Sequence, residues 1–268
     1  MAANDIIRTE GLTKTFGTIH AVEDVDFSVD EGEVMALVGD NGAGKSTLIK
    51  MLCGVLQPTE GSIYFRGERM EFEDYNAARN QGIETVYQDL ALAESQSVAA
   101  NVFLGHEPLR TNPIARWLRL VDENDMRAEA KKSLDRVNIP VDPEAEVSNV
   151  SGGQQQAVAI ARALQSDPDI LIMDEPTSAL SIEGARNVLQ VVDELRNQGL
   201  TIILISHNIR HVITVADRVS VLANGRLMGV EDTDSTTRED LIALMMGAED
   251  ESEFEELDLS GSDEVSTA

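Results

Sequence analysis

The nine-residue stretch GDNGAGKST, from Gly39 to Thr47, constrains the fold of this chain more than any other feature of its sequence. It follows the apolar segment EVMALVG at 33–39, which predicts a buried strand, and leads into KSTLIKMLCGV, which predicts a helix from Lys45. The pattern G-x-x-x-x-G-K-[ST] between a strand and a helix is typical of a loop that holds nucleotide phosphates. Its glycines let backbone N–H groups curve around phosphate oxygens, and the helix N-terminus adds its positive dipole end. The sequence therefore predicts an α/β nucleotide-binding core.

The side chains of this loop have separate expected roles. Lys45 is expected to reach the β- and γ-phosphates, Ser46 to ligate Mg²⁺, and Thr47 to add an N–H or hydroxyl contact. The rest of the loop is expected to bind phosphate mainly through its backbone. These positions are Gly39, Asp40, Asn41, Gly42, Ala43 and Gly44.

Two acidic residues after a second apolar segment are candidates for the chemistry. In ILIMDEP, at 170–176, four apolar residues predict a buried strand, and Asp174 emerges at its end. We expect Asp174 to hold Mg²⁺, directly or through water. Glu175 is expected to polarise an attacking water as a general base. Pro176 stops the strand and favours this reading over a plain surface acid.

A histidine follows the next apolar segment. His207 comes directly after LTIILIS at 200–206, so it is expected at the C-terminal edge of a core strand. There it can donate a hydrogen bond to the γ-phosphate and orient water. His207 and His211 are spaced as a possible metal pair, but no HExxH glutamate or third ligand accompanies them, so we expect no metal between them.

The pattern along the chain predicts a mainly parallel core sheet with flanking helices. An alternating segment at 19–29 and the hairpin GSIYFRGERM predict an antiparallel sheet beside it. The region 76–149 is more polar and is predicted to be a helical insertion. Asn224 followed by glycine predicts a second hairpin, and REDLIALMMG predicts the last helix. One helix face is predicted between the two buried strands, formed by Ala185, Val188, Leu189, Val192 and Leu195.

The charge of the chain is strongly negative. It has 48 acidic and 21 basic residues, a net charge of −27, and only five of the basic residues are lysine. Repulsion on this scale opposes folding unless salt screens it. We therefore favour adaptation to the molar cytoplasmic salt of a halophilic archaeon over a merely acidic protein. Nucleic acid is not an expected partner, because phosphate contacts need basic patches.

Neither end of the chain predicts a membrane span. The N-terminal stretch MAANDIIRTE lacks the apolar core of a signal peptide, and no apolar run is long enough to cross a bilayer. The last residues, 249–268, hold nine acids and no base and are predicted to be a disordered tail. The chain is therefore expected to be soluble, or attached to a membrane only through a partner.

Four motifs occur here in the order found in ATP-binding-cassette (ABC) ATPases. They are GDNGAGKST, the glutamine of VYQD, SGGQ and LIMDEP, and a histidine follows a later strand. The resemblance covers about residues 5–247. SGGQ with a downstream Asp-Glu pair separates the chain from P-loop kinases and GTPases. The chain is thus identified as a member of this family, whose fold is a cassette with a mainly parallel core sheet, an antiparallel β subdomain and a helical subdomain.

The resemblance implies further roles. Two cassettes pack head to tail around two ATP molecules, so the signature residues of one would contact the γ-phosphate bound by the other; these are Ser151, Gly152, Gly153 and Gln154. Phe16 matches the aromatic residue that stacks on adenine. Gln88 matches the residue that touches Mg²⁺ or the attacking water and senses the membrane partner. Ser181 stands where many members have Asp, which leaves any carboxylate role there without support.

The segment at 89–107 lies where importers of this family contact their membrane subunits. This segment and SGGQQQAVAIARAL are similar to monosaccharide importers of the ribose, xylose and fructose type. The resemblance implies an ATP-hydrolysing subunit that couples ATP, with Mg²⁺, to sugar import at the cytoplasmic face of the membrane. Its implied partners are transmembrane permease subunits, an extracellular solute-binding protein, and a second cassette, either identical or a paralogue.

The expected domain organisation follows from this resemblance. Residues 1–248 are expected to form one ATPase domain, with a helical subdomain at about 90–165 inserted in the core, followed by the acidic tail at 249–268. Import of another solute (a nucleoside or an amino acid) and an exporter subunit remain alternatives. A soluble, non-transport ABC ATPase is a further alternative, although such proteins usually carry coiled-coil insertions, zinc motifs or tandem cassettes.

Overall fold

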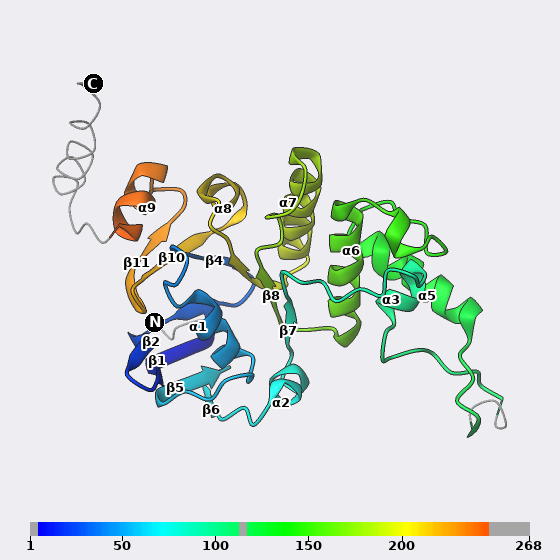
Figure 1. Cartoon of the computed structure of the whole chain (residues 1–268), viewed down its shortest axis with the longest axis horizontal. Helices are drawn as coiled ribbons and strands as arrows, with labels where there is room; N and C mark the ends of the chain where they lie inside the picture. Colours follow the sequence, from blue (N-terminus) through cyan, green and yellow to red (C-terminus); the bar gives the residue numbers. More distant parts are fainter. Residues whose placement is uncertain (1–4, 113–116, 247–268) are drawn as a thin grey trace, which may run out of the picture. The chain divides into compact units, whose positions relative to one another are not determined.

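A computed structural model describes residues 5–112 and 117–246 of the chain. The chain divides into two compact units, of which the second, Tyr75–Ile203, interrupts the first in sequence. The helical subdomain predicted at about 90–165 falls inside the second unit. The acidic tail predicted at 249–268 lies outside the described residues. Figure 1 gives the element labels used below.

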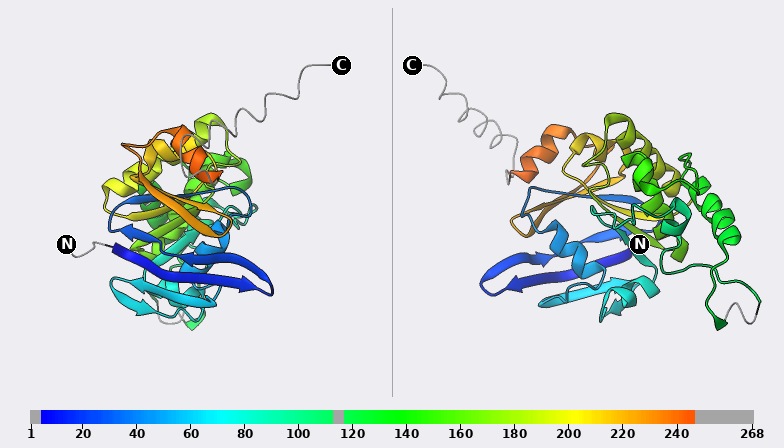
Figure 2. Two further views of the ribbon diagram at one scale, coloured as in Figure 1. Left: turned by 90° about the vertical axis from the view of Figure 1, so that its left-hand side faces the viewer. Right: turned by 45° about the vertical axis from the view of Figure 1, so that its right-hand side comes forward.

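An antiparallel sheet occupies one side of the first unit, as predicted (Figures 1 and 2). Its strand order is β2-β1-β5-β6, and β3 also pairs with β1. The single strand predicted at 19–29 is wrong in detail: the chain forms two strands there. Asp24 has a positive φ of 52°, and the N–H of Phe27 donates to Thr9 Oγ1 instead of continuing the β1–β2 ladder. The strands are β1 (Asp5–Phe16), β2 (Ile19–Val25), β3 (Ser28–Asp30), β5 (Glu60–Phe65) and β6 (Glu68–Met70).

The rest of the first unit carries a parallel strand pair and a hairpin. β4 pairs in parallel with β10, and β10 forms an antiparallel hairpin with β11. Asn224 and Gly225 have φ values of 50° and 80° at the hairpin turn, which is the type I′ geometry that an Asn-Gly pair favours. Gly225 accepts a hydrogen bond from the N–H of Glu23, so the hairpin lies against β2. The elements are β4 (Val34–Val38), α1 (Lys45–Leu52), α8 (Ile209–Val215), β10 (Arg218–Ala223), β11 (Arg226–Asp232) and α9 (Arg238–Met245).

The second unit combines parallel strands with helices. Ile83 pairs in parallel register with Ile170, and Val86 with Met173. The region 76–149 was predicted to be a helical insertion, and it contains the helices α2, α3 and α5, but the strand at 83–86 within it was not predicted. All four residues of this strand are buried, but it is too short, between polar stretches, to stand out by periodicity.

The helices and strands of the second unit have the following bounds. They are α2 (Tyr75–Asn80), β7 (Ile83–Val86), α3 (Val98–Val102), α5 (Glu123–Arg136), α6 (Gly152–Ala163), β8 (Ile170–Asp174), α7 (Ile182–Asn197) and β9 (Thr201–Ile205), whose last two residues belong to the first unit. Two 3₁₀ turns lie at Val147–Asn149 and Leu164–Ser166.

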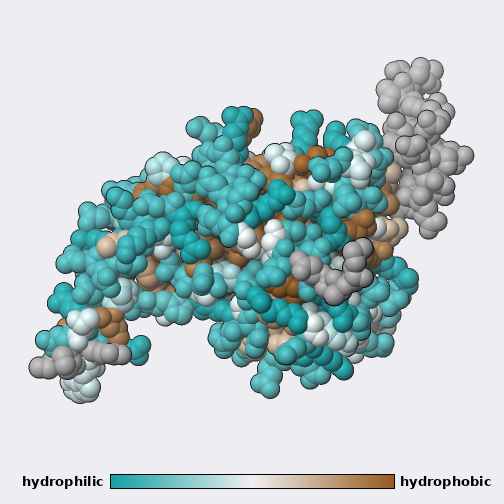
Figure 3. Space-filling view, turned by 180° about the vertical axis from the view of Figure 1, so that it is seen from behind, coloured by the Kyte–Doolittle hydropathy of each residue, from teal (hydrophilic) through white to brown (hydrophobic). Residues whose placement is uncertain are grey.

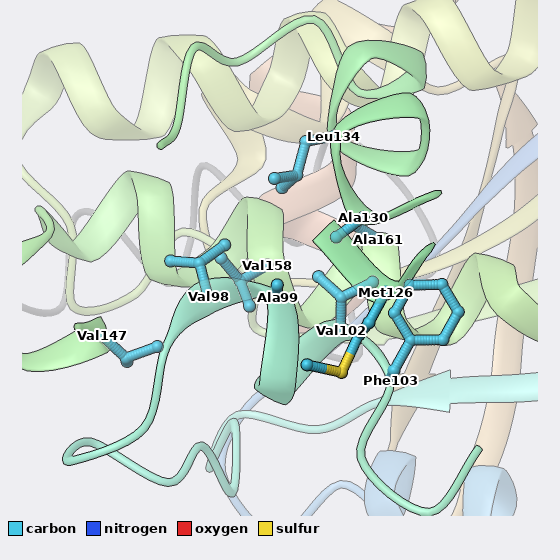
Figure 4. Close-up of a cluster of buried hydrophobic side chains, with 10 residues drawn as sticks. All are labelled: Val98, Ala99, Val102, Phe103, Met126, Ala130, Leu134, Val147, Val158 and Ala161. Carbon is cyan, nitrogen blue, oxygen red and sulfur yellow. The ribbon is translucent and has the colours of Figure 1, made fainter. Parts of the chain in front are cut away.

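Helices α3, α5 and α6 of the second unit share an apolar core (Figure 4). Small residues on α6, such as Ala161, let the helices approach closely, while Val102 and Phe103 fill the space between α3 and α5. Each fully buried valine or larger apolar side chain contributes roughly 1.5–3 kcal/mol. The core residues are Val98, Ala99, Val102, Phe103, Met126, Ala130, Leu134, Val147, Val158 and Ala161.

The predicted fold class is confirmed by these elements. Parallel pairs of strands, an antiparallel sheet and a helical core are all present. None of the helices formed by residues 5–112 and 117–246 is both long and apolar enough to cross a bilayer.

Candidate nucleotide and catalytic site

The loop after β4 in the first unit is built so that only glycine fits at two of its positions. Gly39 and Gly44 have φ values of 150° and 106°. A Cβ at Gly39 would lie 2.1 Å from the carbonyl oxygen of Leu222, and one at Gly44 would lie 2.4 Å from that of Ala21. Both contacts are with backbone and cannot relax cheaply. The loop therefore passes closely over its neighbours with its backbone free to curve around an anion.

Lys45 places its positive charge inside this loop. Its side chain is buried, and Nζ donates to the carbonyl oxygens of Gly39 at 2.6 Å and Asp40 at 3.0 Å. The loop is braced from outside by the N–H of Gly225, which donates to the carbonyl of Ala43 at 2.9 Å. Ser46 is exposed in the first turn of α1. The arrangement suits a polyphosphate, because a buried ammonium and a helix N-terminus converge on one curved backbone segment.

Two more predicted residues lie in the first unit. Phe16 ends β1 and is 48% exposed, so it is not a core residue and its ring is accessible for stacking. His207 is exposed and follows β9. The N–H of Ser206 donates to the carbonyl of Leu37, so the chain reaches His207 beside the end of β4, close to the point where the phosphate loop begins.

The acidic pair lies in the second unit at the end of β8. Asp174 ends the strand and is half-buried. Glu175 has a φ of 50°, in the left-handed region that residues other than glycine rarely adopt. Its carbonyl accepts hydrogen bonds from the N–H and the Oγ of Ser178, at 3.2 and 3.0 Å, which close a turn. A strained backbone held by such a turn is characteristic of functional positions.

A pocket of about 340 Å³ brings together three separately predicted residues of the second unit. Gln88, Gly152 and Glu175 all line it. Gln88 follows β7 and Glu175 follows β8, and the two strands are parallel neighbours, so both residues come from the same edge of the sheet.

Gln156 of α6 also lines this pocket, and sequence reasoning missed it. It is only 5% exposed, and its Nε2 has no hydrogen-bond partner among the described residues. A buried amide without a partner is rare in proteins and marks a place where a ligand or water is expected. The available signal was a polar residue in the middle of the apolar, buried stretch of a helix.

The loop that carries Gln88 is held by the half-buried side chain of Arg162 and the buried side chain of Asn101. Arg162 of α6 donates to the carbonyl oxygens of Leu90 at 2.6 Å and Ala91 at 3.1 Å. Partial burial lowers the pKa of the Arg162 guanidinium. Asn101 is fully buried, accepts from the N–H of Ala93 and donates to its carbonyl. Gln88 is thus followed by a fixed segment and not by a free loop.

The SGGQ stretch begins helix α6 with a capping box. The Oγ of Ser151 accepts from the N–H of Gln154, and Oε1 of Gln154 accepts from the N–H of Ser151 at 2.9 Å. A Cβ at Gly152 would lie 3.0 Å from Leu180 Cδ2, and one at Gly153 would lie 3.1 Å from the Cα of Gly184. Gly153 is therefore favoured by backbone packing as well as by any approach of phosphate, whereas at Gly152 the neighbouring leucine side chain can move.

The signature residues border a second pocket of about 440 Å³ together with the turn before α7. Ser181 belongs to this turn and caps α7, accepting from the N–H of Gly184 at 3.1 Å. An aspartate can cap a helix in the same way. The serine at this position therefore keeps the structural role that a carboxylate would have.

The oxygen donors predicted for magnesium suit that ion. Ser46, Gln88 and Asp174 supply a hydroxyl, an amide carbonyl and a carboxylate. Mg²⁺ usually takes only one or two protein ligands and completes its shell with phosphates and water. Within the described ranges no group of three or more His, Cys, Asp or Glu residues is arranged to hold a metal by itself.

The geometry defines a P-loop protein with a phosphate loop in one unit, and with an acidic turn and an SGGQ helix start in the other. A family model described as ABC transporter matches residues 22–178. The chain belongs to the ABC transporter family, and its fold is that of the ATP-binding cassette.

Three known proteins illustrate the similarity. The fructose import ATP-binding protein FrcA of Rhizobium meliloti is 40% identical over 252 residues, which are 93% of this chain and 97% of that protein. The xylose/arabinose import ATP-binding protein XylG of Sulfolobus acidocaldarius is 41% identical over 243 residues, 90% of this chain and 94% of that protein. A dimeric post-hydrolysis ATP-binding cassette bound to ADP and Pi superposes with a TM-score of 0.70 at 26% identity, covering 85% of this chain and 98% of that one.

Proposed function

We propose that this chain is the ATP-hydrolysing subunit of a transporter that imports a monosaccharide. The observation that carries the proposal is the pocket shared by Gln88, Gly152 and Glu175, which unites the three predicted catalytic and signature elements of the second unit. The similarity to fructose and xylose/arabinose import proteins over nearly the whole chain supports the choice of cargo class.

In this proposal the first unit binds ATP. The backbone from Gly39 to Gly44 and the Lys45 ammonium hold the phosphates, and the exposed ring of Phe16 stacks on the adenine. Ser46 and Asp174 would hold Mg²⁺, with Gln88 as a further oxygen donor. The ion would neutralise charge on the β- and γ-phosphates.

The hydrolytic step uses Glu175 as the base. A water oxygen bonds to the γ-phosphorus while the bond from that phosphorus to the ADP oxygen breaks. The Glu175 carboxylate accepts the proton that the water loses. His207 donates a hydrogen bond to the γ-phosphate and keeps the water aligned. The turn at Glu175 and Ser178 fixes the base before substrate arrives.

A second cassette completes the site. The N-terminus of the twelve-residue helix α6 is exposed at Ser151 and Gly152, and its N–H groups are suited to a γ-phosphate held by a partner. A related cassette has been seen as a dimer with ADP and Pi. The proposal is therefore a head-to-tail dimer, with an identical or paralogous partner.

The permease is proposed to dock on the segment 89–107. A groove of about 490 Å³ lies along this segment and α5, with Leu104 half-exposed at its side and Met126 in its lining. Asn101 and Arg162 hold the segment through hydrogen bonds. A displacement of the groove by the permease would therefore also move Gln88. The proposal therefore includes a peripheral position at the cytoplasmic membrane face, in a complex that also contains an extracellular solute-binding protein.

Replacement of the proposed base tests the catalytic assignment. Glu175→Gln should retain ATP binding but hydrolyse it about 10²–10⁴-fold more slowly, since a general base contributes a factor of that order. It should also accumulate an ATP-bound dimer on size-exclusion chromatography. Glu68→Gln, an exposed acid on β6, is the matched control. Wild-type turnover in Glu175→Gln would refute the assignment.

The shared site and the cargo need their own experiments. Ser151→Arg should block hydrolysis while leaving ATP binding by the monomer intact, whereas Ser151→Thr keeps the helix cap and should remain active. Uptake of labelled ribose, xylose and fructose by a deletion strain then identifies the cargo. Retention of uptake for all three sugars would contradict the proposed cargo class.

A further inference from the structure

The chain between α3 and α5 forms a paired arm. The N–H of Arg110 donates to the carbonyl of Leu120 at 2.9 Å, and the N–H of Asp122 donates to that of Pro108 at 2.8 Å. Leu109 and Val121 form an antiparallel bridge. Figure 1 shows this part of the chain extending away from α3 and α5 within the second unit. We use "the arm" for residues 108–112 and 117–121.

The arm carries large apolar side chains into solvent. Trp117 is 82% exposed and is the only tryptophan of the chain. Leu118 is half-exposed, and Leu109 and Leu120 are exposed beside it. Figure 3 shows hydrophobic side chains on this projection. A cluster of this kind on a protein surface marks an interaction site, because exposing an indole ring and three leucine side chains to water is unfavourable.

The charge of the arm is opposite to that of the rest of the chain. Between Glu107 and Asp122 the sequence has no acidic residue, although the whole chain has 48 acidic and 21 basic residues. Arg110 and Arg119 are exposed, and neither guanidinium forms an ion pair within 4.0 Å of a described carboxylate, although Arg119 interacts electrostatically with Glu107 at the base of the arm. The arm is therefore a basic and aromatic patch on a strongly acidic protein.

We propose that the arm inserts Trp117 and Leu118 into the interfacial layer of an anionic lipid bilayer, with Arg110 and Arg119 on lipid phosphates. Tryptophan prefers the headgroup boundary, where its ring is apolar and its N–H can be hydrated. Arginine binds phosphate through several donors at once. The remainder of the protein is acidic and is repelled by an anionic surface. The basic arm is therefore the element expected to approach such a surface.

The arm begins where the proposed permease groove ends. Glu107 and Val121, at its base, both line the groove assigned to the membrane subunits. This step rests on the proposed function, which brings the groove to the membrane. An acidic protein surface would match the arginines, but the exposed tryptophan and leucines match the boundary between headgroups and acyl chains better.

The single tryptophan makes the arm directly observable. The full chain is mixed with phosphatidylglycerol vesicles or phosphatidylcholine vesicles, in the lowest KCl concentration at which circular dichroism shows it folded. We expect the emission of Trp117 to shift to shorter wavelength and to be quenched by brominated acyl chains with phosphatidylglycerol, with a smaller effect on phosphatidylcholine. The chain should also co-sediment with the anionic vesicles.

Charge-reversal variants separate the arm from the general charge of the protein. Arg110→Glu/Arg119→Glu should weaken co-sedimentation several-fold at this KCl concentration and by less as KCl is raised further, since salt screens the attraction of each basic residue to an anionic surface. Trp117→Ala should weaken it as well. Lys131→Glu/Arg186→Glu removes two exposed cations elsewhere in the same unit and should bind vesicles like the wild type.

An unchanged Trp117 emission with phosphatidylglycerol would overturn the proposal. So would a shift that occurs only when purified permease is added in lipid-free detergent, which would identify a protein partner instead. ATP hydrolysis is measured on the same samples. The arm variants should hydrolyse ATP normally, so a failure of the Glu175→Gln test and a failure of the vesicle test are distinguishable.

Discussion

A Cβ built on Gly153 would lie 3.1 Å from the Cα of Gly184, so α6 and α7 cross with their backbones almost in contact. This crossing holds the start of the signature helix against the turn that precedes α7. Leu180 packs on Gly152 in the same place. The two features that border the proposed partner site, Ser151 and Ser181, are therefore parts of one rigid corner and not independent loops.

Because α6 and α7 cross so closely, we expect Gly153→Ala to lower ATP turnover more than Gly184→Ala does. Alanine is favoured over glycine inside a helix by about 0.8–1 kcal/mol, and both glycines have ordinary helical φ values. Gly153→Ala must nevertheless push the helices apart, because its Cβ would meet backbone. We expect ATP binding to be kept and turnover to fall several-fold, because the helices must separate by a few tenths of an ångström and misplacing a catalytic element by about 1 Å can cost roughly 100-fold.

Gly184→Ala is the matched control for this effect. Its Cβ would lie 3.3 Å from Ser181 Oγ and 3.8 Å from the Cα of Gly153, so less movement is required. We expect turnover near the wild-type value, measured as phosphate release at saturating ATP. Equal turnover in the two variants would contradict the role given to the close contact.

Phe16 is predicted to contribute to nucleotide affinity and not to stability. Its ring is about half exposed at the end of β1, so Phe16→Ala removes little packing. Stacking of a base on an aromatic ring contributes roughly 1–3 kcal/mol, so Kd for ATP should rise by about 5- to 150-fold. Phe16→Trp should restore binding. Titration with a fluorescent ATP analogue measures the effect.

Ile19 provides the control for this prediction. It pairs with Phe16 across the β1–β2 ladder and is also exposed. Ile19→Ala therefore changes the same tip without removing a ring. A similar loss of affinity in both variants would mean that the hairpin tip, and not stacking, determines binding.

The Glu33 carboxyl is expected to make the free energy of unfolding depend on pH. Burial raises the pKa of its carboxyl, although the N–H of Asp30 and the guanidinium of Arg218 partly oppose the shift. A pKa raised in the folded state means that the protonated group favours folding. Its contribution is complete below the unfolded pKa and is lost as pH rises through the folded pKa.

The test compares wild type with Glu33→Gln. Glutamine can still accept the hydrogen bond from Asp30 but has no charge to desolvate. As pH rises from about 4 to 7, across the usual range of a glutamate pKa, the wild type should lose stability relative to the variant. Denaturant unfolding at fixed KCl measures this difference, in which the titration of the many other acids cancels. A difference that does not vary with pH would show that Glu33 titrates normally.

The sequence predicted correctly those parts of the structure whose geometry depends on a few consecutive residues. The phosphate loop, the Asn-Gly hairpin at Asn224 and the acidic strand end at Asp174 each depend on a short sequence with its own geometry. The strand at 83–86 was missed because its burial comes from a distant partner, β8. β1 was not predicted either, because Gly11 and an irregular register interrupt its alternation.

The sequence identified individual residues of the candidate site but not their arrangement in space. Glu175 was identified as the base, but its left-handed backbone could not be read from Asp-Glu-Pro. Gln156 was missed because its importance comes from the pocket that it lines, which includes residues from Gln88 to Leu180. The glycines of SGGQ were interpreted through phosphate contact alone. Their second role, the approach of α7, appears only when the two helices are placed together.

The charge of the chain predicts a requirement for salt. With a net charge of −27, repulsion between acids extends over about 10 Å at 0.1 M salt but only about 3 Å at 1 M. We expect the chain to unfold, as followed by circular dichroism, when KCl falls below about 1 M.

The double variant Glu60→Lys/Glu68→Lys reverses two exposed charges on neighbouring strands and should lower the KCl concentration needed for folding. Because potassium chloride acts here by screening, an equal osmolality of a neutral sugar should not substitute for it at low ionic strength. Full stability of the wild type in dilute buffer would show that the acidic surface is not an adaptation to molar salt.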